Sequence, residues 1–159
     1  MKANETRVDK FLASNETTFA IPVYQRNYDW TKIQCQQLFK DIVAVGSDDK
    51  QSAHFIGSIV YVHDDVYTAS GLTELTIIDG QQRLTTITLL YVAIYRHAIS
   101  EGNNPLAQRL YKTFLINEFA DDAEKLKLKP TDNNKLALAQ ILDPQETNKV
   151  QGFSRLIEN

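Results

Sequence analysis

The sequence predicts an α+β fold in which a small mixed sheet is flanked by helices. Three segments are rich in β-branched or aromatic residues and are bounded by turn signals, namely 19–27, 54–63 and 74–78. Helical patterns of apolar residues precede, separate and follow them. The chain has 159 residues and is 43% hydrophobic, enough to form one core without disulfides. Its single cysteine, Cys35, cannot form an internal disulfide and is interpreted as structural.

The first half of the chain reads as helix, irregular strand and helix. Residues 4–14 carry apolar residues at helical spacing, and Pro22 favours an edge or irregular strand over 19–27. Thr31 and Gln34 have the spacing of a capping box, which predicts a helix over 31–45 that ends near Gly46. Its expected apolar face consists of Leu38, Phe39, Ile42 and Val45.

The centre of the chain predicts two strands and a long helix. A hairpin loop over 64–72 is expected to join strands 54–63 and 74–78. Asp79 and Gln82 again have capping-box spacing, so a helix is expected from about residue 80 to 100, with Asp79 as its cap. Because this helix is apolar on nearly every side, we expect it to be the buried central helix.

The last third predicts a helical extension. A helix starting at Asn104-Pro105, a short strand near 126–129 and helices over 132–142 and 147–157 are expected. The predicted domains are a core at 1–102 that contains the sheet and a helical extension at 103–159. No capping signal follows the last amphipathic stretch, so the natural protein is expected to continue past residue 159.

Charge and composition argue against several classes of protein. The net charge of −3 argues against strong non-specific DNA binding, which depends on lysine and arginine. No apolar run approaches the ~20 residues of a membrane span, and the N-terminus is polar, so a cytoplasmic protein without membrane contacts is expected. The chain lacks a Walker-type glycine loop. Its three histidines lack the spacing of a zinc site.

The segment 76–86, Thr-Ile-Ile-Asp-Gly-Gln-Gln-Arg-Leu-Thr-Thr, carries the main chemical signal. A strand enters a tight turn that opens a helix, where free amides and the helix dipole favour phosphate. Gly80 allows close approach of a ligand, and Arg83 offers a planar fork of donors. Asp79 could cap the helix, hold Mg²⁺ or orient a water. A purely structural strand–turn–helix remains open, although it explains Gln81, Gln82 and Arg83 less well and leaves two poor helix formers, Thr85 and Thr86, unexplained.

A second segment, 21–30, interleaves aromatic and donor side chains as Ile-Pro-Val-Tyr-Gln-Arg-Asn-Tyr-Asp-Trp. Aromatic faces stack on bases, and arginine pairs with phosphate. The alternative is an edge strand whose aromatic residues cover a small core, and the sequence pattern favours that alternative.

Three motifs together, 21–30, 54–60 (His-Phe-Ile-Gly-Ser-Ile-Val) and 77–86, resemble the N-terminal domain of the GmrSD-type modification-dependent restriction endonucleases. The likeness extends through 38–42 and faintly to 126–132. It implies a fold related to ParB and sulfiredoxin, with a nucleotide pocket on a small mixed sheet. It also implies binding and hydrolysis of a nucleoside triphosphate with Mg²⁺.

The resemblance assigns residues to this pocket. Expected nucleotide-binding residues are Tyr24, Gln25, Arg26, Gly80, Gln81, Arg83 and Thr85. Expected catalytic residues are Asp79, Gln82 and Arg83, with Asp79 also as the metal ligand.

Family members usually continue into a His-Asn-His nuclease domain, a motif that this sequence lacks. A further domain or a partner subunit is therefore expected to cut modified DNA, while this chain regulates it by hydrolysing nucleotide. The alternatives are a module that senses DNA or its modification without hydrolysis, and a structural domain whose motifs only pack.

Overall fold

The computed structural model describes residues 4–14, 16–49, 53–63, 71–118, 120, 125–142 and 156. Within them one four-stranded sheet has the order β2-β3-β1-β4. Strand β3 (Thr73–Asp79) lies parallel to β1 (Thr17–Ala20) and antiparallel to β2 (Val60–His63), and β1 lies parallel to β4 (Leu128–Lys129). The expected α+β class with a small mixed sheet is confirmed.

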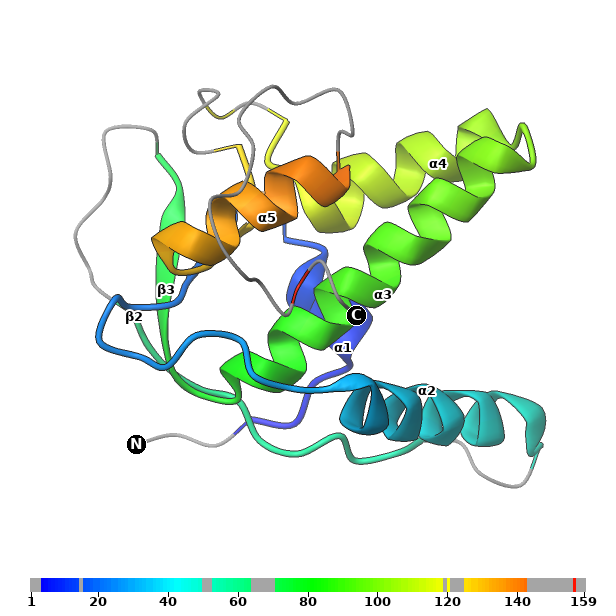
Figure 1. Cartoon of the computed structure of the whole chain (residues 1–159), viewed down its shortest axis with the longest axis horizontal. Helices are drawn as coiled ribbons and strands as arrows, with labels where there is room; N and C mark the ends of the chain where they lie inside the picture. Colours follow the sequence, from blue (N-terminus) through cyan, green and yellow to red (C-terminus); the bar gives the residue numbers. More distant parts are fainter. Residues whose placement is uncertain are drawn as a thin grey trace.

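Helices make up most of the remaining described chain and lie mainly to one side of the strands (Figure 1). The 20-residue helix α3 crosses the middle of the molecule, and the sheet lies at one end of it. The helices are α1 (Val8–Leu12), α2 (Lys32–Ser47), α3 (Gln81–Ser100), α4 (Asn104–Leu110), the π-helical turn η1 (Tyr111–Leu115) and α5 (Asp132–Leu142). None of the helices in the described ranges is long and apolar enough to cross a membrane.

The core lies between the sheet and α3. Phe19 on β1 and Ile77 on β3 are almost fully buried, as is Leu84 in the first turns of α3. Leu128 of β4 and Leu138 of α5 belong to the same core. The predicted boundary at residue 102 stays a prediction, but residues on both sides of it pack into one core.

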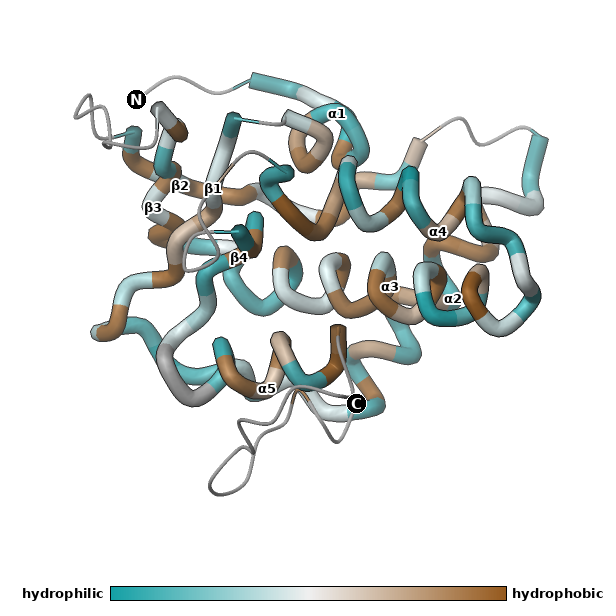
Figure 2. Tube along the Cα trace, turned by 90° about the horizontal axis from the view of Figure 1, so that it is seen from above, coloured by the Kyte–Doolittle hydropathy of each residue, from teal (hydrophilic) through white to brown (hydrophobic). Residues whose placement is uncertain are grey.

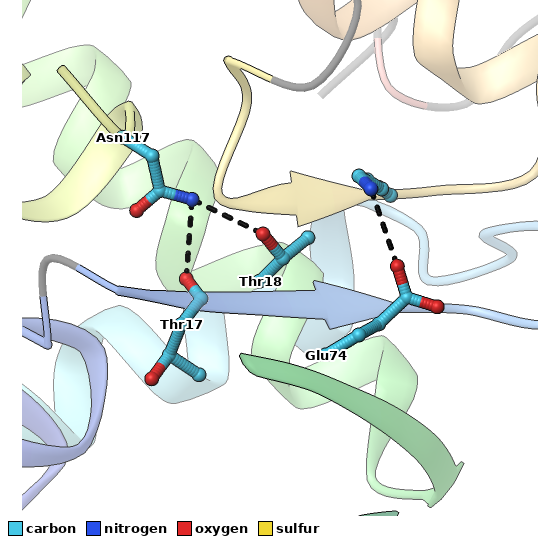
Figure 3. A network of polar contacts seen from close by, with 5 residues as sticks. Thr17, Thr18, Glu74 and Asn117 are labelled. Carbon is cyan, nitrogen blue, oxygen red and sulfur yellow. Dashed lines mark hydrogen bonds and ion pairs between the residues drawn. The ribbon is translucent and has the colours of Figure 1, made fainter. Parts of the chain in front are cut away.

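Polar contacts tie the C-terminal third to the sheet (Figure 3). Asn117 donates from Nδ2 to the Thr17 carbonyl at 3.3 Å and to Thr18 Oγ1 at 3.1 Å, and Lys129 pairs with Glu74 at 3.2 Å. Lys127 is 1% exposed, and its ammonium donates to the carbonyls of Leu12, Ser14 and Thr113 at 3.0, 2.7 and 2.5 Å.

Several predicted elements are shorter than expected. Helix α1 begins at residue 8 rather than 4, β1 covers 17–20 rather than 19–27, and β2 covers only the end of 54–63. In the second half of α3, Ala93, Ile94, Arg96 and His97 are exposed, so this helix is buried mainly in its first half. Most of the hairpin loop predicted over 64–72 and most of the helix predicted over 147–157 lie outside the described residues.

The apolar face predicted for α2 packs on the core only in part. Leu38 is the buried residue of this helix, whereas Phe39 is 54% and Ile42 36% exposed. The predicted capping box at its start is confirmed, with the Gln34 side chain accepting the Thr31 amide at 3.0 Å. Helix α2 lies along an edge of the molecule, extending away from the sheet (Figure 1).

Candidate functional site

The candidate site lies where three parallel strands end. Strands β3, β1 and β4 are neighbours and run in one direction, so their carboxyl ends share one edge of the sheet. Strand β1 leads into 21–31, β3 into Gly80 and α3, and β4 into Thr131 and α5. The two motifs that the sequence singled out therefore meet at this edge, which is a common place for ligand sites in sheets with parallel strands.

Gly80 forms the turn between β3 and α3 and is the N-cap of the helix, with φ 90° and ψ 4°. A Cβ here would stand 3.0 Å from the Ser58 carbonyl oxygen and 3.1 Å from the Ile59 Cα. The left-handed backbone and this close approach both demand glycine. The first amides of α3 have no partner within the helix and emerge at this turn.

The prediction that Asp79 caps α3 through a capping box with Gln82 is wrong. Asp79 is the last residue of β3 and pairs in the sheet with Val60, which places it one position before the cap. The N-cap is Gly80, which has no side chain with which to cap the helix. The Asp79 carboxylate instead lies 3.7 Å from Arg83 and is 70% exposed.

Three glutamines fasten 21–31 to the end of β3 and the start of α3. Gln25 donates to the Ile78 carbonyl at 3.1 Å, and Gln81 donates to the Arg26 carbonyl at 3.2 Å. Gln82 donates to the Asn27 carbonyl at 3.1 Å and accepts the Asp29 amide at 2.8 Å. These bonds satisfy the backbone of an irregular segment, which explains why long amide side chains occupy these positions.

A small pocket of about 180 Å³, including space open to solvent, lies between these segments. Arg26 reaches it from the segment after β1, while Gln81 and Thr85 line it from the first turns of α3. Gln81 is 8% exposed, and its Oε1 has no hydrogen-bond partner among the described residues. The remaining lining residues are Ile21, Tyr28, Gln82, Thr131 and Asn134.

Tyr28 forms the inner wall of the pocket. It is 6% exposed, and its hydroxyl lies 2.8 Å from Thr86 Oγ1 and 3.2 Å from Cys35 Sγ. Thr86 also donates to the Gln82 carbonyl at 2.8 Å. Thr86 is therefore a packing residue that anchors the tyrosine, which supports the structural reading for this one position, and Cys35 has the structural setting that was expected.

Arg83 points away from the pocket. Successive residues of a helix are rotated by about 100°, which sets Arg83 roughly 160° from Gln81 and Thr85 around α3. Its Nη2 donates to the Ser58 carbonyl at 2.7 Å, and its guanidinium packs on Gly57, where a Cβ would stand 3.0 Å from Cζ. Arg83 thus holds the segment before β2 against the first turn of α3, and its Nε is buried without a partner in the described chain.

The structure therefore divides the predicted site residues. Arg26, Gln81, Gln82 and Thr85 share the pocket, whereas Asp79, Gly80 and Arg83 lie at the turn beside it. Gln25 does not line the pocket but supports the site through its hydrogen bond to the Ile78 carbonyl. Tyr24 is 73% exposed on the adjoining turn.

Sequence reasoning missed the contribution of the segment after β4. Thr131 donates to Asn27 Oδ1 at 2.8 Å, and Asn134 donates to Thr131 Oγ1 at 3.2 Å. The available signal was the family-like stretch at 126–132, in which Thr131 directly precedes the helix that begins at Asp132.

Asp79 supplies the one carboxylate among the predicted site residues, and its side chain is exposed. The described residues contain no cluster of three or more His, Cys, Asp or Glu side chains. Asp79 alone fits Mg²⁺ delivered by a triphosphate, because Mg²⁺ is commonly held by one or two carboxylates together with the phosphate oxygens.

Comparison with known proteins identifies one family. Residues 8–158 match the family described as the GmrSD restriction endonuclease, N-terminal domain. The match spans the sheet, the pocket and the helices on both sides of it. No curated protein matches the chain.

Proposed function

This chain belongs to the family of the GmrSD restriction endonuclease N-terminal domain, and from that premise we propose that it binds and hydrolyses a nucleoside triphosphate with Mg²⁺. In this role it is the regulatory domain of a cytoplasmic phage-defence nuclease that acts on modified DNA. A His-Asn-His nuclease domain or a partner subunit supplies the cleavage. The relation to the ParB and sulfiredoxin fold belongs to the same proposal.

One observation carries the proposal: a cation, a buried amide oxygen and a helix N-terminus converge at the end of three parallel strands. Arg26 lines the pocket from the segment after β1, and Gln81 lines it from α3 with its Oε1 buried and without a hydrogen-bond partner in the described part of the chain. A buried polar atom without a partner carries a desolvation cost of about 1–3 kcal/mol, which a ligand donor would remove. A ribose or base N–H or O–H would supply that donor, while the amides of α3 and Arg26 take the phosphates.

The size of the pocket sets which part of the ligand it holds. Its volume of about 180 Å³ includes space open to solvent, and only about 10 Å³ is room for a water-sized group, which is roughly the space of one water molecule. The pocket therefore takes a single donor group of the nucleotide, and the rest of the ligand lies over the exposed turn that carries Val23 and Tyr24. An aromatic ring 73% exposed beside a phosphate site is suited to stack on a base.

The chain's other residues act by positioning. Gln82 fixes 27–29 and so fixes the backbone on which Arg26 stands. Asp79 is the proposed ligand of Mg²⁺, which neutralises charge on the phosphates when bound. Arg83 sits 3.7 Å from that carboxylate and holds its orientation, so its proposed catalytic role passes through Asp79.

The test compares two threonines of α3. Thr85 lines the pocket and is 3% exposed, whereas Thr88 is 6% exposed and donates to the Leu84 carbonyl, outside the pocket. Valine keeps the shape of threonine, so Thr85→Val should weaken Mg²⁺–triphosphate binding and phosphate release while Thr88→Val leaves both unchanged. Binding is read as ligand-induced thermal stabilisation for each of the common nucleoside triphosphates. Wild-type protein that is stabilised by none of them and releases no phosphate would refute the proposal.

A DNA- or modification-sensing module without hydrolysis is the second candidate. The exposed Val23 and Tyr24, 80% and 73% accessible beside Arg26, favour it because such a tip can stack on an unpaired base. Phosphate release separates the two functions. Binding of modified oligonucleotides with no turnover of any triphosphate would favour sensing alone.

A further inference from the structure

Helix α2 is an amphipathic helix whose apolar stripe is only partly covered. Of its 16 residues only Leu38 is buried, while Phe39, Ile42 and Val43 are 54%, 36% and 48% exposed. Cys35, Phe39, Ile42 and Gly46 follow one another at spacings of three and four, so they form one stripe along the helix. A helix of this length depends on the packing of its apolar face for most of its stability.

This stripe forms one wall of an open groove between α2 and α3. The groove has a volume of about 680 Å³, including space open to solvent. Its α3 wall is also apolar, formed mainly by Leu89, Leu90 and Ala93. In the hydropathy view the tube of α2 carries several apolar turns beside polar ones (Figure 2). Two helices that present aligned apolar stripes form a seat for a third helix.

We propose that the occupant is α2 of a second copy of this chain, packed antiparallel across a two-fold axis near Phe39. The stripe is self-complementary in this arrangement, because Phe39 meets Phe39 at the axis and Cys35 lies opposite Val43 of the second copy. Each Phe39 fills the groove of the other copy, and the two α2–α3 pairs become a four-helix assembly. A self-complementary patch is what a two-fold interface requires.

The charges of α2 also fit an antiparallel partner. Lys32 stands at the start of the helix on the line of the apolar stripe, and Asp49 follows its end. Pairing centred on Phe39 brings Lys32 opposite Gly46 of the second copy, about one turn from its Asp49. The basic start of each helix therefore meets the acidic end of the other, and the two helix dipoles oppose each other favourably.

The groove lies against the candidate nucleotide site, although the proposal does not depend on that site. Cys35 and Thr86 line the groove, and both contact the Tyr28 hydroxyl, whose ring lines the pocket. The two cavities share this wall.

The decisive variant is Phe39→Asp, measured by sedimentation velocity over a concentration series. Wild type should form a dimer, and the variant should raise the dimer dissociation constant by at least about tenfold, because hot-spot aromatic residues dominate such interfaces. Phe55→Asp is the matched control, since Phe55 is 81% exposed but lies outside the groove. It should dimerise like wild type.

A thiol crosslink locates the interface independently of stability. Phe39 is kept, and on the otherwise wild-type chain Val43→Cys should be joined to Cys35 of the second copy by a short bifunctional thiol reagent. Ile33→Cys on the same background should not, because it lies on another side of α2. A chain that stays monomeric at every concentration would overturn the proposal and assign the groove to another segment or partner. A dimer that ignores Phe39→Asp, or one that crosslinks equally through position 33, would overturn it as well.

Discussion

We expect substitutions of Arg26 and of Arg83 to have opposite effects on ligand binding and on folding, although both residues belong to motifs expected to hold phosphate. Arg26 is exposed in the free protein and lines the pocket. Arg83 is bonded to the Ser58 carbonyl and packs on Gly57. Replacing each by alanine therefore separates ligand binding from folding, with the two variants serving as each other's control.

The magnitudes follow from the contacts. Arg26→Ala removes a charge-assisted contact to phosphate worth about 1.5–3 kcal/mol, so triphosphate affinity should fall tenfold or more, since about 1.4 kcal/mol is a factor of ten. Stability should change by no more than about 0.5 kcal/mol, as for other surface substitutions. Arg83→Ala removes the 2.7 Å bond to Ser58. Because that side chain is 29% exposed, its loss should cost about 1–2 kcal/mol of unfolding free energy.

The assay is a paired titration with triphosphate and Mg²⁺, alongside denaturant unfolding of each protein without ligand. Arg83→Ala should lower the denaturation midpoint and weaken nucleotide binding less than Arg26→Ala does. Equal ligand-induced stabilisation of wild type and Arg26→Ala would remove Arg26 from the site. A large binding defect in Arg83→Ala at unchanged stability would show that Arg83 contacts the ligand directly, against its orientation in the structure.

Three further predictions concern the turn, the buried lysine and DNA. Gly80→Ala should lower the free energy of unfolding by about 2 kcal/mol or more, because the backbone of Gly80 is left-handed. Gly46→Ala, in open space on α2, should instead stabilise the helix by about 0.5–1 kcal/mol. Equal effects of the two variants in chemical denaturation would contradict this prediction. Burial lowers the pKa of Lys127 to about 8, so the unfolded chain holds this proton more tightly, and wild type should gain stability relative to Lys127→Met as the pH rises from about 8 toward 10.5; a pH-independent difference between their unfolding free energies would refute it. The isolated chain, with a net charge of −3, should bind unmodified duplex DNA weakly at physiological salt, and tight binding in a fluorescence titration would overturn that expectation.

Much of the fold could be predicted because its signals are local. The capping box at Thr31 and Gln34, the turn at Gly80 and the apolar run after it each depend on a few neighbouring residues. The ends of β1 and β2 could not be predicted, because a strand ends where its neighbour stops pairing. The stretch 54–59 has good strand composition, yet the sheet partner of β2 ends at Asp79, opposite Val60.

The capping error at Asp79 has the same origin. An aspartate three positions before a glutamine satisfies the capping-box spacing, but spacing does not say whether the strand has already ended. Here the sheet holds Asp79 in extended conformation, and the N-cap moves to Gly80. Gln82, freed from a capping role, bonds to backbone more than fifty positions away. Hydrogen bonds between residues so far apart in the sequence cannot be predicted from the residues around Gln82.

The candidate site shows which part of a motif a sequence can assign. Neighbouring residues of the motif Asp79-Gly80-Gln81-Gln82-Arg83 project from different sides of one helix turn. A motif that the sequence presents as one site therefore contributes to two separate places in the structure. Gln81 faces the pocket with Arg26, and Arg83 faces the segment before β2. The motif therefore couples two loops through the first turn of α3. A ligand that contacts Arg26 and Gln81 acts on the same turn that Arg83 holds through its hydrogen bond to the Ser58 carbonyl. For that reason we expect the losses of affinity and of stability in the double variant Arg26→Ala/Arg83→Ala to differ from the sums of the losses in the two single variants. Additive losses would show that the two sides of the turn are independent.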